Sequence, residues 1–122
     1  MKIRIKANSI RLRLSKSEVA KFGIDGYLEE TTNFPGQQLI YALQKASQWD
    51  DLTADLHQTK ITVFMPEGMM REWVESEKVG YSSDMRIGDT GSLHILVEKD
   101  FVCLDETLED QSDNFENPNK SC

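Results

Sequence analysis

Two short runs near the start of the chain alternate apolar and basic side chains without interruption. They are Lys2-Ile-Arg-Ile-Lys6 and Ile10-Arg-Leu-Arg-Leu14. A period of two is the pattern of a β-strand with one buried face, and Asn8-Ser9 between the runs favours a tight turn. The sequence therefore predicts a hairpin whose Ile and Leu side chains face a core while its basic side chains face outward.

Five basic side chains share the outward face of this predicted hairpin: Lys2, Arg4, Lys6, Arg11 and Arg13. Like charges on paired strands repel one another, so this face needs counter-charge. We interpret it either as a candidate anion-binding site or as the structural counterpart of acidic side chains elsewhere in the chain, and the structural interpretation is favoured. Nucleic acid is not the expected partner, because nucleic-acid-binding domains are usually basic overall with exposed aromatic side chains, whereas this chain has a net charge of −7.

The opposite end of the chain is acidic. Residues 100–122 contain seven acidic side chains and a single lysine. Asp105, Glu109, Asp110 and Asp113 are candidates for a docking or cation site, but their spacing is not that of an EF-hand loop, and no metal is expected. A solvated acidic tail is the simplest alternative. We expect the segment to dock on the basic hairpin, with Leu108 and Phe115 as apolar anchors.

Two helices are expected between these ends. Ser15 and Glu18 form a capping box that starts the first helix, and Pro66 starts the second, which Gly80 is expected to close. Residues 81–91 read as a loose segment with a short strand around residues 85–87. The remaining expected strands cover residues 27–33, 38–45, 52–57, 60–65 and 92–98.

The predicted elements repeat in the order strand, strand, helix, strand, strand, once in residues 2–45 and again in residues 52–98. The expected fold class is α+β: a mostly antiparallel sheet or small barrel of seven or eight strands with two helices, and with a duplicated β-β-α-β-β unit. Residues 1–104 are expected to form a single domain, with halves 1–45 and 52–98. Residues 105–122 form the acidic segment that follows it.

This element order resembles that of the CYTH-type triphosphate tunnel enzymes, which have an eight-stranded antiparallel barrel and a charged amino-terminal strand. Their strand motif is Glu-x-Glu-x-Lys, in which the glutamates hold metal and the lysine holds phosphate. The matching stretch here is Lys2-Ile-Arg-Ile-Lys6, so only Lys6 fits the motif. The resemblance implies a layout, and the metal site of that family has no counterpart on this strand.

The whole chain also resembles a family of small bacterial proteins of unknown function. The resemblance is carried by the opening run that ends in Asn8-Ser-Ile-Arg-Leu-Arg-Leu14 and by Glu98-Lys-Asp-Phe-Val-Cys-Leu-Asp-Glu-Thr107 with Glu109-Asp-Gln-Ser-Asp-Asn114. It implies a free-standing bacterial domain of which the acidic end is a part. It implies no reaction, ligand or partner.

Together these observations predict a non-catalytic binding or interaction domain whose partner is a protein or a small anion. No catalytic motif and no cofactor motif stands out, so catalytic residues, metal and cofactor are all predicted to be absent. The alternative is a phosphate- or nucleotide-directed phosphohydrolase or binder in which the five cations line a tunnel-like barrel. A cytoplasmic location is expected, because the amino terminus lacks a secretory pattern and no apolar run is long enough to span a membrane.

Overall fold

The fold of the chain was analysed from a computed structural model that describes residues 1–101, 113 and 115. In this part of the chain, eight strands and two helices follow one another. They are β1 (Lys2–Lys6), β2 (Ser9–Leu14), α1 (Lys16–Asp25), β3 (Tyr27–Phe34), β4 (Gln37–Ala46), β5 (Thr53–His57), β6 (Lys60–Pro66), α2 (Glu67–Glu75), β7 (Gly80–Ile87) and β8 (Gly91–Lys99). The α+β class with two helices and eight strands is thereby confirmed.

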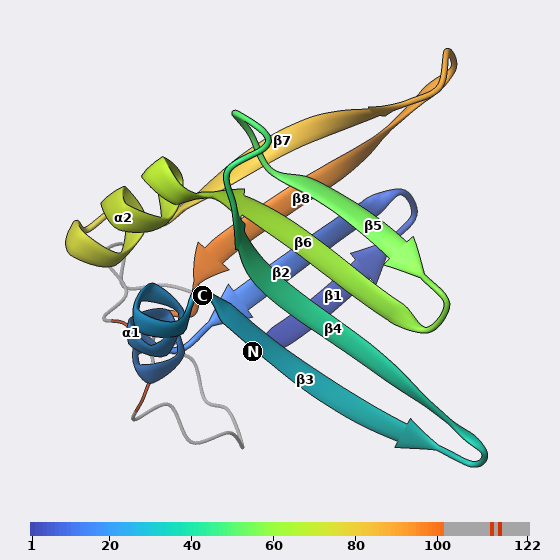
Figure 1. Cartoon of the computed structure of the whole chain (residues 1–122), viewed down its shortest axis with the longest axis horizontal. Coiled ribbons are helices and arrows are strands. Elements are labelled where there is room, and N and C mark those ends of the chain that lie inside the picture. The colour runs from blue at the N-terminus through green and yellow to red at the C-terminus, as the bar shows by residue number, and fades with distance from the viewer. Residues whose placement is uncertain (102–112, 114, 116–122) are drawn as a thin grey trace.

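The strands form two four-stranded sheets, with strand orders β1-β2-β8-β7 and β3-β4-β6-β5. In Figure 1 the second sheet lies in front of the first, and both helices lie at the same end of the molecule. Each sheet contains two antiparallel hairpins joined by one parallel pair, β2 with β8 and β4 with β6. The sheets are therefore mixed.

The expected duplication is visible in the element order, because β1-β2-α1-β3-β4 and β5-β6-α2-β7-β8 are built alike. Each sheet takes one hairpin from each half. The outer strands of the first sheet are β1 and β7, and those of the second are β3 and β5. Each half therefore contributes one outer strand and one inner strand to both sheets.

The core lies between the two sheets and extends to the helices at one end. Trp73 of α2 and Phe22 of α1 are fully buried, and their rings meet edge to face with centroids 6.3 Å apart. The Nε1–H of Trp73 donates to the Val79 carbonyl at 3.0 Å. The core side chains from both sheets and helices are Leu12, Leu14, Val19, Phe22, Leu28, Leu43, Leu52, Ala54, Val63, Met65, Met70, Trp73, Ile95 and Val97.

Two local expectations are wrong in detail. The helix α2 ends at Glu75, and Gly80 begins β7 instead of closing the helix. The segment after Gly80 is a full strand of eight residues, paired with β8 along its whole length. The sequence does not predict this strand because its outward face is polar, with residues such as Ser82 and Asp84, and its inward face is only partly apolar, so the apolar alternation is weak.

The end of the molecule opposite the helices is open and carries exposed apolar side chains. Ile5 is 56% exposed and Leu56, which occupies the equivalent position of the second half, is 70% exposed. Phe34 and Ile87, at the ends of β3 and β7, are another equivalent exposed pair. The expectation that Ile5 faces a core is therefore wrong, because the described residues leave more than half of its side chain uncovered.

Candidate functional site

The five predicted cations lie on one outward face of the first sheet, the surface named here the basic face. The pairing register places Lys2 opposite Arg13 and Arg4 opposite Arg11, while Lys6 lies opposite Ser9. Leu12 and Leu14, which alternate with the arginines of β2, are fully buried in the core. The structure thus brings all five side chains together on the side of the sheet that faces away from the core.

Two carboxylates from the end of β8 neutralise part of this face. Glu98 Oε1 accepts a hydrogen bond from Arg13 Nε at 2.8 Å and lies 3.8 Å from Arg11 Nη1. Asp100 Oδ2 lies 3.1 Å from Lys2 Nζ. These contacts all lie toward the helix end of β1 and β2, so the counter-charge is concentrated there.

The other end of the basic face carries cations without an acidic neighbour among the described residues. Arg4 and Lys6 are exposed, and no described carboxylate lies within ion-pair distance of either. They line a shallow depression of about 270 Å³ together with Ser9, Arg11 and Leu96. The depression therefore combines two guanidinium groups, one ammonium and one hydroxyl over an apolar floor.

The pKa of Arg11 indicates that positive charge is disfavoured in this depression. Partial burial and the neighbouring Arg13 and Arg4 lower the pKa of Arg11, and Glu98 offsets only part of this effect. The guanidinium stays protonated at neutral pH. A lowered pKa still means that the surroundings disfavour its positive charge, and a bound anion would relieve that cost.

Asp113, one of the predicted docking residues, contacts the start of α1 instead of the basic face. Its carboxylate accepts hydrogen bonds from the Ser17 hydroxyl at 2.6 Å and from the Ser17 N–H at 3.1 Å. Its carbonyl accepts from the Lys16 N–H at 2.8 Å. A carboxylate is stabilising at this place, because the first turn of a helix has free N–H groups and the positive end of the helix dipole.

Phe115 contacts the body of the protein nearby. Its N–H donates to the Asp100 carbonyl at 2.8 Å, its ring lies edge to face with Phe101 at 5.8 Å, and Lys99 Nζ lies 5.1 Å from the ring centroid. The other members of the acidic set, Asp105, Glu109 and Asp110, lie outside the described residues, as do Leu108 and both cysteines. Docking of the acidic segment over the basic face stays a prediction.

The alternative in which the five cations line a tunnel does not agree with this geometry. The space between the sheets is occupied by apolar side chains such as Leu12, Leu43 and Ile95. The cations lie on the other side of the sheet, and the two sheets contain parallel strand pairs. The layout resemblance to the CYTH-type tunnel enzymes therefore has no support in the site.

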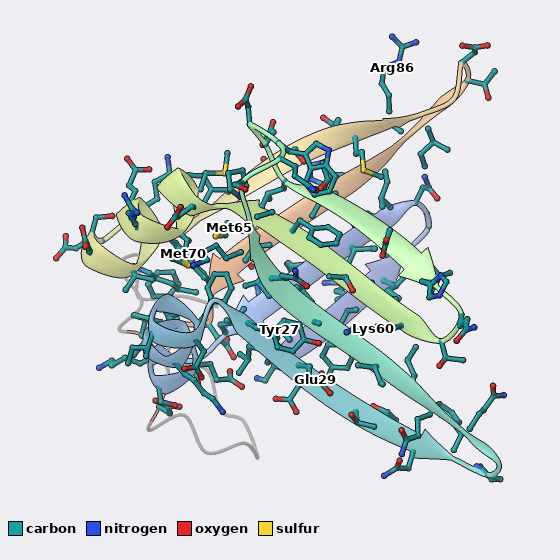
Figure 2. All side chains as sticks on the ribbon, in the orientation of Figure 1. Tyr27, Glu29, Lys60, Met65, Met70 and Arg86 are labelled. Carbon is teal, nitrogen blue, oxygen red and sulfur yellow. The ribbon has the colours of Figure 1, made fainter. Side chains whose placement is uncertain are left out.

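The outer face of the second sheet also carries a polar cluster. Figure 2 shows Tyr27, Glu29 and Lys60 close together on this face, which is turned to the viewer. The Tyr27 hydroxyl donates to Glu29 at 2.7 Å, and Lys60 Nζ lies 5.1 Å from the Tyr27 ring centroid. The groups of this cluster satisfy one another, in contrast to Arg4 and Lys6 on the first sheet.

Within residues 1–101, 113 and 115, no three His, Cys, Asp or Glu side chains are grouped as metal ligands. None of the helices in the described part of the chain has the length and apolarity that a bilayer crossing requires.

Comparison with known families matches residues 1–119 to DUF7009, a family of unknown function. The chain belongs to this family. The match covers the basic face and extends through the acidic end, so both are parts of the DUF7009 sequence. Searches among curated proteins and among solved structures found no match.

Sequence reasoning found the cations of the site and missed their neighbours. Leu96, Glu98 and Asp100 approach the hairpin only because β8 pairs in parallel with β2. The alternation along β8 is a sequence signal that places Leu96 and Glu98 on one strand face. No sequence signal indicates that this strand pairs with β2, more than eighty residues earlier.

Proposed function

We propose that this protein is a non-catalytic binding module that recognises an anionic group of its partner through the basic face. The observation that carries the proposal is the depression lined by Arg4, Lys6, Ser9 and Arg11, in which Arg4 and Lys6 have no acidic neighbour among the described residues. Carboxylate and phosphate groups fit such a set, because guanidinium groups bind their oxygens in a bidentate manner.

The charge of the rest of the protein supports a specific anion site over general attraction to polyanions. The chain has a net charge of −7, so its overall field repels anions. This acidic protein gathers five cations on one face of the β1-β2 hairpin, where like charges repel one another. A ligand that neutralises this face would bind the folded protein but not the unfolded chain, and would therefore stabilise the folded state.

A bacterial, cytoplasmic setting is also an expectation from the sequence.

Titration with tripolyphosphate at low ionic strength tests the proposal. We expect the double variant Arg4→Gln/Lys6→Gln to weaken binding by about tenfold or more, because each charge-assisted hydrogen bond contributes about 1.5–3 kcal/mol. The matched control is Lys21→Gln/Arg71→Gln, which removes the same two charges from exposed positions of α1 and α2. We expect the control to change the Kd by less than about twofold.

Two results would count against the proposal. Absence of tripolyphosphate binding to the unmodified protein would contradict it directly. Equal weakening in both double variants would show that net charge, and not the basic face, determines the affinity.

A further inference from the structure

We infer that the free edge of β1 binds an extended acidic segment of a partner protein by strand addition. This inference rests on the proposed function and adds the class of ligand and its conformation. The added strand would continue the first sheet beyond β1 and place its carboxylates beside the basic face. Strand addition is a general mode of peptide recognition, in which main-chain hydrogen bonds supply affinity and alternate side chains supply specificity.

The hydrogen bonds at the two ends of β2 establish which of its residues bond to β8. The Asn8 carbonyl accepts from the His94 N–H at 3.1 Å, and the Leu14 carbonyl accepts from the Asp100 N–H at 2.8 Å. Backbone groups alternate between the two sides of a strand. The even-numbered residues of β2 therefore bond to β8, and the odd-numbered residues bond to β1.

The same alternation determines which backbone N–H and C=O groups of β1 point away from β2. Lys2, Arg4 and Lys6 lie opposite the odd-numbered residues of β2, so their N–H and C=O groups bond to that strand. The N–H and C=O groups of Ile3 and Ile5 consequently point to the opposite side. Within the described residues, no backbone hydrogen bond reaches Ile3 or Ile5 from that side. Figure 1 shows β1 at the edge of its sheet, and β3 diverges from β1 toward the turn that joins β3 to β4.

The side chains of β1 indicate which strand fits this edge. On one face, Lys2, Arg4 and Lys6 follow one another at every second position, with Arg4 and Lys6 lacking a described acidic neighbour. On the other face, the side chain of Ile5 is 56% exposed. A strand in which acidic and apolar residues alternate would place carboxylates beside the cations and apolar side chains over Ile5.

The equivalent strand of the second half, β5, also has an exposed apolar side chain, Leu56, but it differs in charge. The outward positions of β5 are Thr53, Asp55 and His57, which carry no fixed positive charge. The residues before the two strands make similar contacts with the other sheet, because the Tyr41 hydroxyl donates to the Met1 carbonyl at 3.2 Å and the Ser83 hydroxyl donates to the Leu52 carbonyl at 2.8 Å. The two halves therefore offer a matched comparison between a basic edge and an edge that is not basic.

Charged side chains on an edge strand usually prevent pairing with other chains. That role explains why two copies of β1 would not pair, since the cations of both strands would be brought together. It does not explain Arg11, because Arg11 belongs to the inner strand β2, which has no free edge, and Glu98, which is hydrogen-bonded to Arg13, offsets the charge of Arg11 only in part. The extension of positive charge onto β2 favours a partner of opposite charge.

The test uses two peptides of identical composition, acetylated and amidated at their ends. One alternates Val and Glu over seven residues (Val-Glu-Val-Glu-Val-Glu-Val), and the other groups them (Glu-Glu-Glu-Val-Val-Val-Val). We expect the alternating peptide to bind at least about fivefold more tightly. In the complex, amide hydrogen exchange should slow at Ile3 and Ile5, whose N–H groups become hydrogen-bonded.

Three variants separate strand addition from simple attraction of charges. Ile5→Pro removes the free N–H, which an edge strand tolerates when that N–H does not bond within the sheet, and Ile5→Ala keeps it. We expect Ile5→Pro to weaken binding of the alternating peptide at least about fivefold beyond Ile5→Ala, which corresponds to one lost hydrogen bond. Leu56→Pro, at the equivalent position of β5, should leave the affinity unchanged.

The outcomes distinguish the inference from the proposed function. If the two peptides bind equally and tripolyphosphate still requires Arg4 and Lys6, strand addition is wrong and the anion site stands. If tripolyphosphate does not bind either, both fail. A dimer that Ile5→Pro abolishes would instead assign the edge to a second copy of the chain. Should Ile5→Pro not fold, unchanged exchange at Ile3 and Ile5 in the unmodified protein with peptide would overturn the inference.

Discussion

Replacing Arg4 by Gln should make the folded protein more stable, although it removes a residue of the candidate site. Arg4 lies at the centre of the basic face, with Lys2 and Lys6 two positions away on the same strand and Arg11 directly opposite. The carboxylates that contact the basic face, Glu98 and Asp100, pair with other cations. The charge of Arg4 therefore experiences more repulsion than attraction.

The magnitude follows from strand geometry. Neighbouring positions on one sheet face lie about 5.5–7 Å apart, and two unit charges about 7 Å apart in water repel by about 0.6 kcal/mol. Three such neighbours give about 1.8 kcal/mol, which the two more distant carboxylates reduce by about half. Screening at 0.1 M salt, where the Debye length is about 10 Å, leaves about 0.5 kcal/mol. The expected rise in Tm is about 2 °C.

Urea unfolding of the unmodified protein, Arg4→Gln and Arg4→Lys measures this effect. Arg4→Lys keeps the charge and serves as the control for lost side-chain packing. We expect the difference in free energy of unfolding between Arg4→Gln and Arg4→Lys to disappear in 1 M salt, where the Debye length is about 3 Å.

A loss of stability in Arg4→Gln that Arg4→Lys does not share would refute the reasoning. It would mean that a carboxylate neutralises Arg4 in the folded protein, as docking of the acidic segment on the basic face predicts. Deletion of residues 105–122 would then be expected to lower the Tm and to create new anion binding.

Three other substitutions test the fold and the contact at α1. Gly80→Ala should lower the free energy of unfolding by about 3 kcal/mol in urea unfolding, because the added Cβ would lie 2.1 Å from the Val97 carbonyl oxygen. Gly68→Ala, whose Cβ would have no neighbour within 4 Å, should raise it by about 0.5 kcal/mol. Asp113→Asn should speed amide exchange at Ser17, which loses its charged acceptor.

The effect of Asp113→Asn should depend on pH. Hydrogen bonds from the Ser15 and Ser17 hydroxyls lower the pKa of Asp113 below its usual value. A lowered carboxyl pKa contributes stability above the unfolded-state value and loses it as pH falls through the folded-state value. The difference in free energy of unfolding between Asp113→Asn and the unmodified protein should therefore be present at neutral pH and vanish in acid. A difference that persists unchanged below both pKa values would contradict this origin.

The sequence predicted what depends on local patterns. The alternation in residues 2–14 determined which side chains of β1 and β2 face outward, and the capping box at Ser15 located the start of α1, where both capping hydrogen bonds are present. The sequence did not reveal that β2 pairs in parallel with β8, because no local signal specifies which distant strand lies beside another. Glu98, which neutralises Arg13, was therefore absent from the predicted site.

The position of Asp113 could not be predicted for a related reason. Charge alone directs an acidic residue equally to five cations or to the N–H groups at the start of a helix. The choice depends on where the chain runs after β8, which brings Phe115 to Phe101 and Asp113 to the start of α1. Local sequence identifies the charges, and chain path determines which of them meet.

The exchange of hairpins between the two halves has a consequence for how the protein folds. The second sheet is built from the consecutive strands β3 to β6, but the first sheet is not complete until the second half has been synthesised, because residues of β2 pair with β8, as Ser9 does with His94. Closing such distant pairs is slow, since chain entropy is lost before the contacts form. A chain cut between residues 47 and 51 should yield two fragments that fold only when mixed. At high concentration, intact chains could trade halves and form a swapped dimer that contains no new interface.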